Sequence, residues 1–293
     1  MNPSSETTIL SGLSADVFVG RDAECRRIDR LCRRKRLNAV LLGAPRIGKS
    51  ELLRRSYDRL FAEGGDVFPI YFSFNRASIE SGMIAQDYIA QFMAQLMAFR
   101  RGDPAIIRSA QGPLNSIGSA AAAQDYVWIK ELIDLFVCAN GSSDAGAAAR
   151  SALSSASASA LHAGITPFVM LDNVHLLADS RAALFRSELL RAMADSAARG
   201  SGAAPAYLLC GLRRPMMEIL PADDGLFDRL ELMRIDPLGE VALQHLIRHT
   251  AADLKVDITD STVELMIQQL GGDLFYVRSV LDAAASRGTG LRT

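Results

Sequence analysis

The feature that most constrains the fold is the stretch from Leu41 to Ser50, which satisfies the pattern GxxxxGK(S/T). A short apolar run beginning at Asn38 precedes it, and a strongly helical segment, Glu51 to Phe61, follows it. Glycines in such a loop permit turns that point backbone N–H groups inward, and the N-terminus of the next helix attracts anions. The stretch predicts a phosphate-binding loop between a strand and a helix; an accidental Gly-Lys-Ser turn is the alternative.

This loop defines the candidate nucleotide-binding residues. They are Gly43, Ala44, Pro45, Arg46, Ile47, Gly48, Lys49 and Ser50. In a loop of this kind the lysine reaches the terminal phosphates and the hydroxyl binds magnesium, so we expect ATP or ADP and Mg²⁺ as cofactors.

Short apolar runs bounded by turn residues indicate the fold class. They span residues 38–43, 67–74, 167–171, 206–210 and 231–235. Helical segments separate them, which is typical of a parallel sheet covered on both faces. The sequence therefore predicts an α/β protein.

The chain divides into a flexible tail (1–16), a core (17–236) and an all-helical C-terminal unit (237–293). The core contains a helical insertion, 76–164, in which apolar residues recur at helical spacing from Ile84 to Leu96 and again from Tyr126 to Val137. Gly112-Pro113 to Ser119 reads as a loop. An amphipathic helix is expected over 22–36. Ser261 and Glu264 fit a capping box that would begin a helix ending at Gly271-Gly272.

A second acidic motif lies where an apolar strand, Phe168 to Leu171, ends in Asp172. This carboxylate is expected beside the phosphate loop, where it would hold magnesium through water; a helix cap is the alternative. The next residue is Asn173, and an amide orients water but cannot accept its proton. Hydrolysis is therefore an open question, with His175 as a substitute base or a structural residue.

Composition excludes several classes of protein. The net charge is −1 and 22% of residues are charged, so no global basic field exists to attract nucleic acid. No apolar run approaches the length of a membrane span, and the first residues lack the pattern of a signal peptide. We therefore expect a cytoplasmic protein without membrane contact.

Several segments together resemble the archaeal-type ATPases within the AAA+ and STAND groups of P-loop NTPases. The segments are Phe18-Val-Gly-Arg-Asp22 with Glu24, Gly43 to Ser50, Leu209-Cys-Gly-Leu-Arg213, Gly225-Leu-Phe-Asp-Arg229, Ile235-Asp-Pro-Leu238 and Gly271-Gly-Asp-Leu-Phe-Tyr276. The resemblance covers most of the chain apart from the tail and the insertion.

This resemblance implies a sheet in the order 5-1-4-3-2, a helical lid, and adenine held near Val19 and Gly20. It makes Arg229 an arginine-finger candidate that reaches a neighbouring subunit, with a surface salt bridge to Asp228 or Glu231 as the alternative. It makes Arg278 a lid sensor of the γ-phosphate, with a solvated helix arginine as the alternative. The sequence departs from the family at Asn173, at Leu212, where a polar sensor is usual, and at Asp273-Leu274, where the family has Asn-Pro.

The first functional hypothesis is an ATP-driven switch that hydrolyses ATP slowly, with Lys49, Asp172, Asn173 and Arg229 as catalytic candidates. The alternative is a nucleotide-sensing scaffold without turnover. A third is a DNA-associated ATPase of the transposition-regulator type, in which the basic stretch 26–36 contacts DNA; a small-molecule kinase ranks last. Expected partners are a second copy or another protein, and nucleic acid is not favoured.

Overall fold

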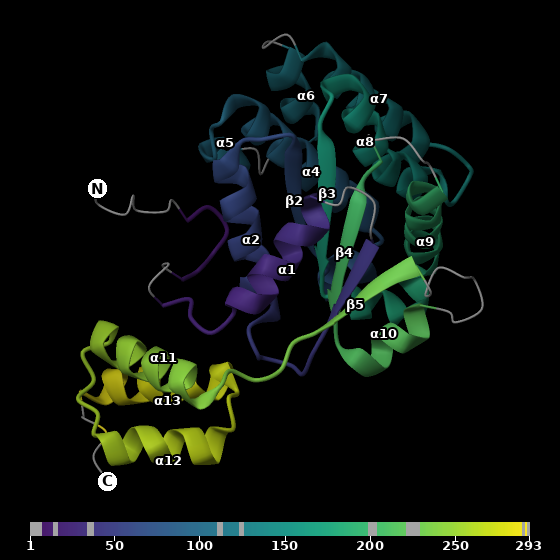
Figure 1. Ribbon diagram of the computed structural model, residues 1–293. Helices are drawn as coiled ribbons and strands as arrows, with labels where there is room; N and C mark the ends of the chain where they lie inside the picture. Colours follow the sequence, from purple (N-terminus) through teal and green to yellow (C-terminus); the bar gives the residue numbers. More distant parts are fainter. Residues whose placement is uncertain are drawn as a thin grey trace.

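The computed structural model describes residues 8–13, 17–33, 38–109, 114–122, 126–198, 204–220, 229–288 and 291. A five-stranded sheet forms its centre (Figure 1). Its strands are β1 (Asn38–Leu42), β2 (Val67–Ser73), β3 (Thr166–Asp172), β4 (Ala206–Gly211) and β5 (Leu230–Arg234). They lie in the order β2-β3-β4-β1-β5, and every neighbouring pair is parallel. The α/β fold and the order 5-1-4-3-2, read here from the other edge, are confirmed.

Helices cover both faces of the sheet. On one face lie α1 (Asp22–Arg33) and α2 (Lys49–Glu63), and the other carries α4 (Ile84–Arg101), α8 (Ala147–Ala163), α9 (Ala183–Ala198) and α10 (Arg213–Ile219). Alternate residues of a strand point to opposite faces, so β1 contributes Leu41 to one core and Val40 to the other. All five residues of β1 are therefore buried. The strand that carries the phosphate loop lies inside the molecule.

The long segment between β2 and β3 consists, in its described parts, of helices joined by short turns. It contains α3 (Arg76–Glu80), α4, α5 (Ala105–Ser109), α6 (Leu114–Ala122), α7 (Val127–Asn140) and α8. The helices expected around residues 84–96 and 126–137 are confirmed as α4 and α7. The predicted loop is wrong from Leu114 onward, because Leu114, Ile117 and Ala121 bury one helical stripe in the core. Residues 112 and 113 lie outside the described part. Two 3-10 turns, η1 (Val174–Ala178) and η2 (Ser180–Ala182), connect β3 to α9.

The open edge of the sheet at β2 is covered by a side chain of α4. Gln95 is buried; it donates a hydrogen bond to the Tyr71 carbonyl and accepts one from the Tyr71 N–H, each at 2.8 Å. These backbone groups would otherwise be unpaired on an edge strand. One amide therefore satisfies the edge and fixes α4 against β2.

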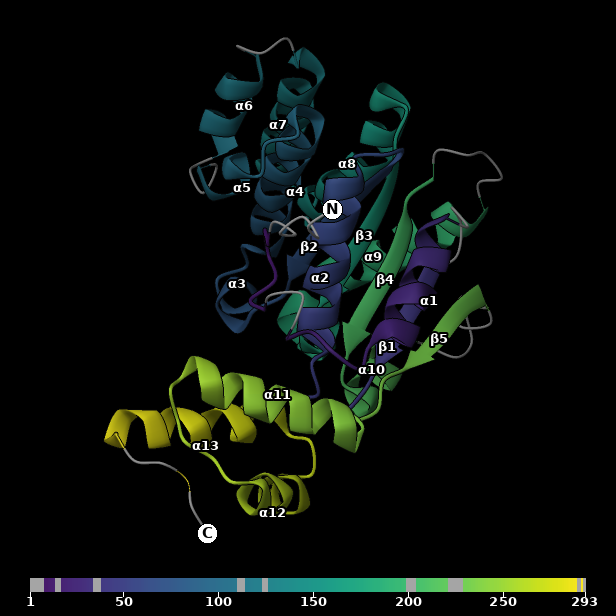
Figure 2. The same cartoon turned by 60° about the vertical axis from the view of Figure 1, so that its left-hand side comes forward.

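The three C-terminal helices, α11 (Glu240–Asp253), α12 (Asp260–Leu270) and α13 (Leu274–Arg287), pack around an apolar core of their own. Figures 1 and 2 show them as a separate group below the sheet, joined to it after β5. The expected end of α12 is confirmed, because Gly271 adopts the left-handed conformation. The expected capping box is wrong: the cap is Thr259, whose hydroxyl accepts from the Thr262 N–H. No helix among the described residues is long and apolar enough to cross a membrane.

The described part of the N-terminal segment is attached to α2. Residues 9–13 donate backbone hydrogen bonds to the carboxylates of Asp58 and Glu51. We expected a flexible tail over residues 1–16, so this attachment is a difference from the sequence-based expectation for residues 8–13. Residues 1–7 and 14–16 lie outside the described part.

Candidate nucleotide-binding site

The phosphate loop occupies the turn between β1 and α2. A Cβ atom placed on Gly43 would lie 2.5 Å from Ile235 Cγ2 and 2.8 Å from the Ile235 carbonyl oxygen, so no larger residue fits there. Gly48 has φ 92° and Arg46 has φ 61°, both in the left-handed region. These conformations turn the chain from β1 into α2. The strand, turn and helix expected around the loop sequence are present in this order, and the turn is here termed the cradle.

Lys49 is buried within this cradle. Its Nζ donates to the Gly43 carbonyl at 3.1 Å and to the Ala44 carbonyl, and the side chain is 9% exposed. Burial lowers the pKa of the Lys49 ammonium, while Cys210 and Asp172 nearby act in the opposite direction. The ammonium is positioned at the loop by neutral carbonyls, which leaves its charge available to a phosphate group.

The carboxylate of Asp172 lies at the end of β3 and is 2% exposed. Tyr71 of β2 donates its hydroxyl to Asp172 Oδ2 at 3.0 Å. The Arg54 guanidinium of α2 lies over the Tyr71 ring, 5.7 Å from its centroid. Ser50, the second residue of α2, supplies the hydroxyl expected to bind magnesium together with Asp172. Hard oxygen donors of this kind suit Mg²⁺, so the residues present fit the metal.

Asn173 adopts the left-handed conformation with φ 56°, and both of its nitrogen atoms are engaged. Its backbone N–H donates to Asp172 Oδ1 at 2.8 Å, and its side-chain amide donates to Ser73 Oγ at 3.1 Å. The amide oxygen remains to accept a hydrogen bond from water. Half-buried His175 lies near Asp172, Lys49 and Arg76, and burial lowers its pKa, so its ring is neutral near pH 7.

Tyr71 and Ser73 were missed by sequence reasoning. They alternate on β2, and the parallel register pairs Ser73 with Asp172 itself. Polar residues at alternate positions near the end of an otherwise apolar strand are the signal that could have identified them.

A small apolar cavity of about 40 Å³ adjoins the loop on the side where the base was expected. Its walls include Leu13, Val19, Ile47, Gly48, Leu238 and Leu274. Arg21, from the Phe18–Asp22 motif, donates to the Ile47 carbonyl at 2.9 Å and pairs with Glu24 at 3.1 Å. Gly20 lies against α11, where an added Cβ would meet the Ala242 Cβ at 2.6 Å. The motif thus braces the loop and places Val19 at the cavity.

Arg46 connects the phosphate loop to the start of α13. Its carbonyl accepts from the Leu274 N–H at 3.2 Å, and its guanidinium lies 4.4 Å from the Phe275 ring centroid and 5.3 Å from that of Tyr276. It also approaches Asp273, the N-cap of α13, at 3.9 Å. Arg278, the expected sensor, instead directs its guanidinium along α13 to Asp282 at 2.9 Å and is exposed. The structure therefore brings Arg46 to the C-terminal helices but does not bring Arg278 to the loop.

Arg229 lies at the other end of the sheet from the loop. It precedes Leu230, which pairs with the first residue of β1, whereas the loop follows the last residue, Leu42. Four strand residues separate these ends by about 13 Å, so Arg229 does not reach the loop of its own chain. The alternative for Arg229 was a surface salt bridge to Asp228 or Glu231. Glu231 instead pairs with Arg27 at 2.6 Å, and Asp228 lies outside the described part.

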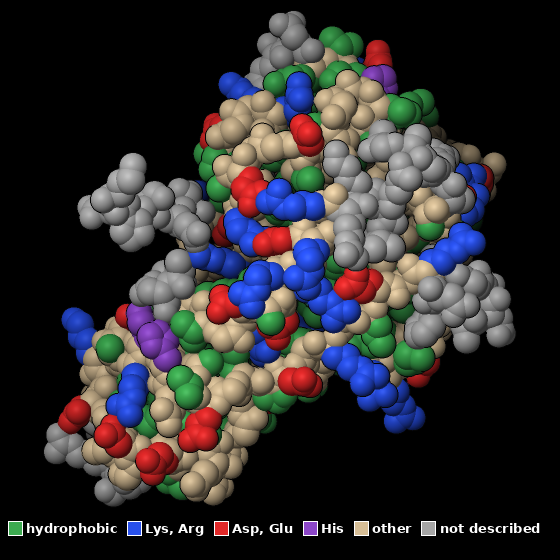
Figure 3. All heavy atoms as spheres, in the orientation of Figure 1, with side chains coloured by type: hydrophobic (Ala, Val, Ile, Leu, Met, Phe, Trp, Pro, Cys, Tyr) green, Lys and Arg blue, Asp and Glu red, His purple; other side chains and the backbone are tan. Residues whose placement is uncertain are grey.

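The basic residues predicted around α1 face carboxylates. Arg27 pairs with Glu231, Arg33 with Glu63, and Arg59 of α2 with Asp29. Figure 3 shows blue and red side chains intermixed over this face. Residues 34–37 lie outside the described part. The described part of the patch is thus close to charge balance, which weakens it as a nucleic-acid surface.

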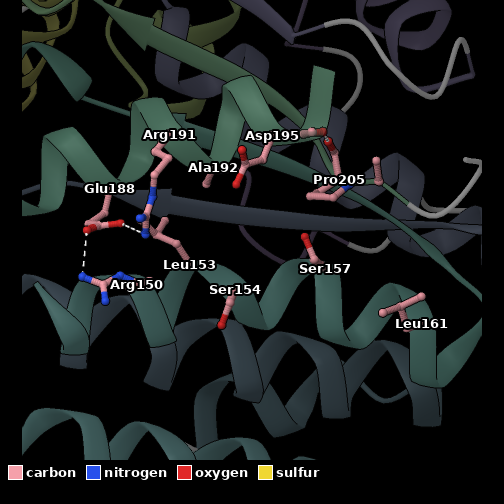
Figure 4. A pocket seen from close by; sticks show the side chains of 12 residues that line it. Arg150, Leu153, Ser154, Ser157, Leu161, Glu188, Arg191, Ala192, Asp195 and Pro205 are labelled. Carbon is pink, nitrogen blue, oxygen red and sulfur yellow. Dashed lines mark hydrogen bonds and ion pairs between the residues drawn. The ribbon is translucent and has the colours of Figure 1, made fainter. Parts of the chain in front are cut away.

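Other cavities among the described residues include two that are lined by arginines. One, of about 500 Å³, adjoins the outer side of the loop and is lined by Arg213, Arg214 and Arg234 together with Asp236. The other, of about 180 Å³, lies between α8 and α9 (Figure 4), where Arg150 pairs with Glu188 at 3.2 Å. The second cavity is far from the phosphate loop in the fold and has matched charges.

The fold is a five-stranded parallel α/β sheet with the GxxxxGKS sequence after strand β1, and solved structures share this fold. Orc1 of Aeropyrum pernix in complex with DNA is 15% identical, with a TM-score of 0.56 over 99% of this chain and 67% of that chain. Domain III of the Thermotoga maritima replication initiation protein DnaA is 11% identical, with a TM-score of 0.52 over 96% of this chain and 94% of that chain.

A DNA replication initiation factor is 12% identical, with a TM-score of 0.50 over 98% of this chain and 66% of that chain. The chain thus spans about two thirds of the length of this factor and of Orc1. No protein-family model and no curated protein sequence matches the chain. At these identities the likeness establishes the fold.

Proposed function

We propose that the protein is an ATP-binding molecular switch of the AAA+/STAND kind, in which the C-terminal helices act as a lid over the nucleotide. The observation that carries this proposal is the contact between Arg46 and α13. Arg46 belongs to the phosphate loop and also contacts α13. A nucleotide that binds at the loop would therefore change the position of the C-terminal helices. The resemblance to replication initiators of the same fold supports ATP as the nucleotide.

Magnesium would be held by Ser50 and Asp172, and Lys49 would neutralise the terminal phosphates. Hydrolysis in this proposal is slow, because position 173 offers an amide oxygen that orients water without accepting its proton. A neutral His175 nearby is the available side-chain base. A hydrolysis-deficient, nucleotide-sensing scaffold is the alternative, and the two hydrogen bonds that fix Asn173 favour it.

Binding and turnover of MgATP by the purified protein test both readings. Wild type is expected to bind MgATP, and Lys49→Ala and Asp172→Ala to lose binding or turnover. Asn173→Glu supplies a carboxylate base and is expected to raise turnover about a hundredfold. Slow phosphate release by wild type that His175→Gln abolishes supports the switch; binding without any release supports the scaffold. Absence of binding refutes both.

Self-association is a further part of the proposal, with Arg229 reaching the nucleotide of a neighbouring copy. It is supported by the exposure of Arg229 and by its distance from the loop of its own chain. ATP-dependent assembly by light scattering, lost in Arg229→Ala but with ATP binding retained, is the expected result. If assembly and turnover are unchanged in Arg229→Ala, Arg229 does not act at the nucleotide of a neighbouring copy.

A nucleic-acid contact is a second candidate, favoured by the arginine-lined cavity rather than by α1. Among the described residues, no ion pair engages Arg213, Arg214 or Arg234, and the Orc1 neighbour was solved in complex with DNA. If DNA binds there, Arg213→Ala with Arg214→Ala should reduce the salt dependence of binding, whereas Arg27→Ala should not. Binding that is insensitive to both changes, or absent, excludes this cavity as a DNA site.

A further inference from the structure

The carboxylate of Asp172 is held by hydrogen-bond donors on two sides. Tyr71 of β2 donates its hydroxyl to Oδ2 at 3.0 Å, and the Asn173 backbone N–H donates to Oδ1 at 2.8 Å. The buried thiol of Cys210 on β4 lies beside the same carboxylate. An ionised carboxylate has about four acceptor positions, so positions remain for the waters around a magnesium ion. The orientation of Asp172 is thus set before any ion binds.

The donor on the β2 side is itself held in place. Tyr71 is buried, and its backbone N–H and carbonyl both bond to the side-chain amide of Gln95 at 2.8 Å. The Arg54 guanidinium lies over its ring, 5.7 Å from the centroid. In the parallel register Tyr71 pairs with Met170, two residues before Asp172. Because the tyrosine is fixed at its backbone and at its ring, its hydroxyl restrains the Asp172 carboxylate to one position.

Burial of the Tyr71 hydroxyl does not by itself explain this bond. Among the described residues, the hydroxyls of Tyr57 and Tyr88 are also buried, and neither has a hydrogen-bond partner. The cores of this chain therefore tolerate unpaired tyrosine hydroxyls. Tyr57 belongs to the same apolar cluster as Tyr71, so the two residues share one environment and differ in the acceptor that only Tyr71 reaches.

The position of Tyr71 separates its effect on the metal from effects on the nucleotide. Tyr71, Gln95 and Arg54 lie on β2, α4 and α2, outside the loop residues 43–50. Groups that orient a metal-binding carboxylate typically contribute about 10–100-fold to metal affinity. Without the Tyr71 hydroxyl, Asp172 would keep the Asn173 N–H and the Cys210 thiol beside it, so the lower end of this range is expected.

We propose that Tyr71 is a positioning residue for magnesium, which acts by holding the Asp172 carboxylate through its hydroxyl. This inference rests on the proposed binding of ATP and magnesium at the phosphate loop. It goes further by assigning to β2 a contribution to metal affinity that leaves the affinity for the metal-free nucleotide unchanged.

Calorimetric titration of the full chain with ATP, once in excess magnesium and once in EDTA, tests this inference. By linkage, the ratio of the two affinities measures how far the protein favours the nucleotide that carries magnesium. Tyr71→Phe keeps the ring and is expected to lower this ratio about tenfold, with binding in EDTA unchanged. Tyr57→Phe removes a buried hydroxyl from the same cluster and is the matched control, which should alter neither affinity. The melting temperature without nucleotide should change no more in Tyr71→Phe than in Tyr57→Phe.

An unchanged ratio in Tyr71→Phe overturns the inference. Equal losses in magnesium and in EDTA also overturn it, because the substitution would then act on the loop as a whole. A higher ratio overturns it as well, since the hydroxyl would then compete with the ion for Asp172. A wild type that binds ATP equally in magnesium and in EDTA removes the metal site and this inference but leaves nucleotide binding standing. A wild type that binds ATP in neither condition refutes the proposed function itself.

Discussion

Replacing Arg46 with alanine should release the C-terminal helices from the phosphate loop. The guanidinium contacts two aromatic rings, at 4.4 and 5.3 Å from their centroids, and approaches Asp273 at 3.9 Å. Cation–π contacts at exposed sites contribute about 0.5–1 kcal/mol each, and an exposed ion pair at 3.9 Å, the outer limit for such a pair, adds close to nothing. The side chain therefore stabilises the closed arrangement by about 1–2 kcal/mol, equivalent to a factor of about 5–30 in the closing equilibrium.

The Leu274 amide reports this opening directly, because its N–H donates to the Arg46 carbonyl only when the helices are docked. Alanine retains that carbonyl, so only the side-chain contribution is removed. Hydrogen exchange at Leu274 should accelerate by the same factor of about 5–30 in Arg46→Ala. Stopped-flow binding of a fluorescent ATP analogue should show faster association if opening limits access to the base cavity.

Arg278→Ala is the matched control. It removes an arginine from α13 whose partner, Asp282, belongs to the same helix, so exchange at Leu274 should not change. If Leu274 exchanges in Arg46→Ala at a rate within twofold of wild type, the Arg46 side chain does not hold the C-terminal helices against the loop. A larger effect of Arg278→Ala than of Arg46→Ala would restore the sensor role that the sequence suggested.

Three further predictions concern the loop, the core and the C-terminal helices. Gly43→Ala should abolish ATP binding and lower the melting temperature, because its methyl group would overlap Ile235 and Ile47, whereas Gly65→Ala, with open space around it, should change neither. Phe92→Ala should lower the free energy of unfolding by about 3–5 kcal/mol in urea titrations, and Leu135→Ala, at an exposed position, by a few tenths. Thr259→Ala should destabilise α12 by about 1 kcal/mol, measured by hydrogen exchange, and more than Ser261→Ala does; the reverse order would support the capping box.

The fold could be predicted to a large extent because its main signals are local. The apolar runs that became the five strands differ from the observed bounds by a residue or so at their ends, since buried parallel strands are apolar throughout. The strand order followed from the family resemblance rather than from any physical property of the runs. The error at Leu114 arose because the Gly112-Pro113 pair indicates a turn but does not say how soon a helix resumes.

The parts of the site that were missed depend on contacts between distant residues. Arg46 was assigned to the nucleotide because of its place in the loop, and its aromatic partners lie more than two hundred residues later. The attachment of residues 9–13 to α2 could not be recognised from the sequence, because its hydrogen bonds are donated by backbone N–H groups, which almost every residue possesses. A buried Asp58 on the apolar side of α2 was the available signal, since a carboxylate is rarely buried without donors.

In the proposed switch, residue 173 affects the hydrolysis of ATP more than the movement of the C-terminal helices. The contacts of Arg46 with α13, about 1–2 kcal/mol, reduce the apparent affinity for a nucleotide that needs the open arrangement by about 5–30-fold, and the binding energy of a nucleotide exceeds this cost. ATP can thus shift the C-terminal helices through binding alone, provided that it interacts differently with the two arrangements. In the proposed switch, the contact of the phosphate-loop residue Arg46 with α13 is one such difference. In the proposed switch, a chain with asparagine at position 173 would therefore signal ATP by binding alone, and slow hydrolysis would serve only to end the signal.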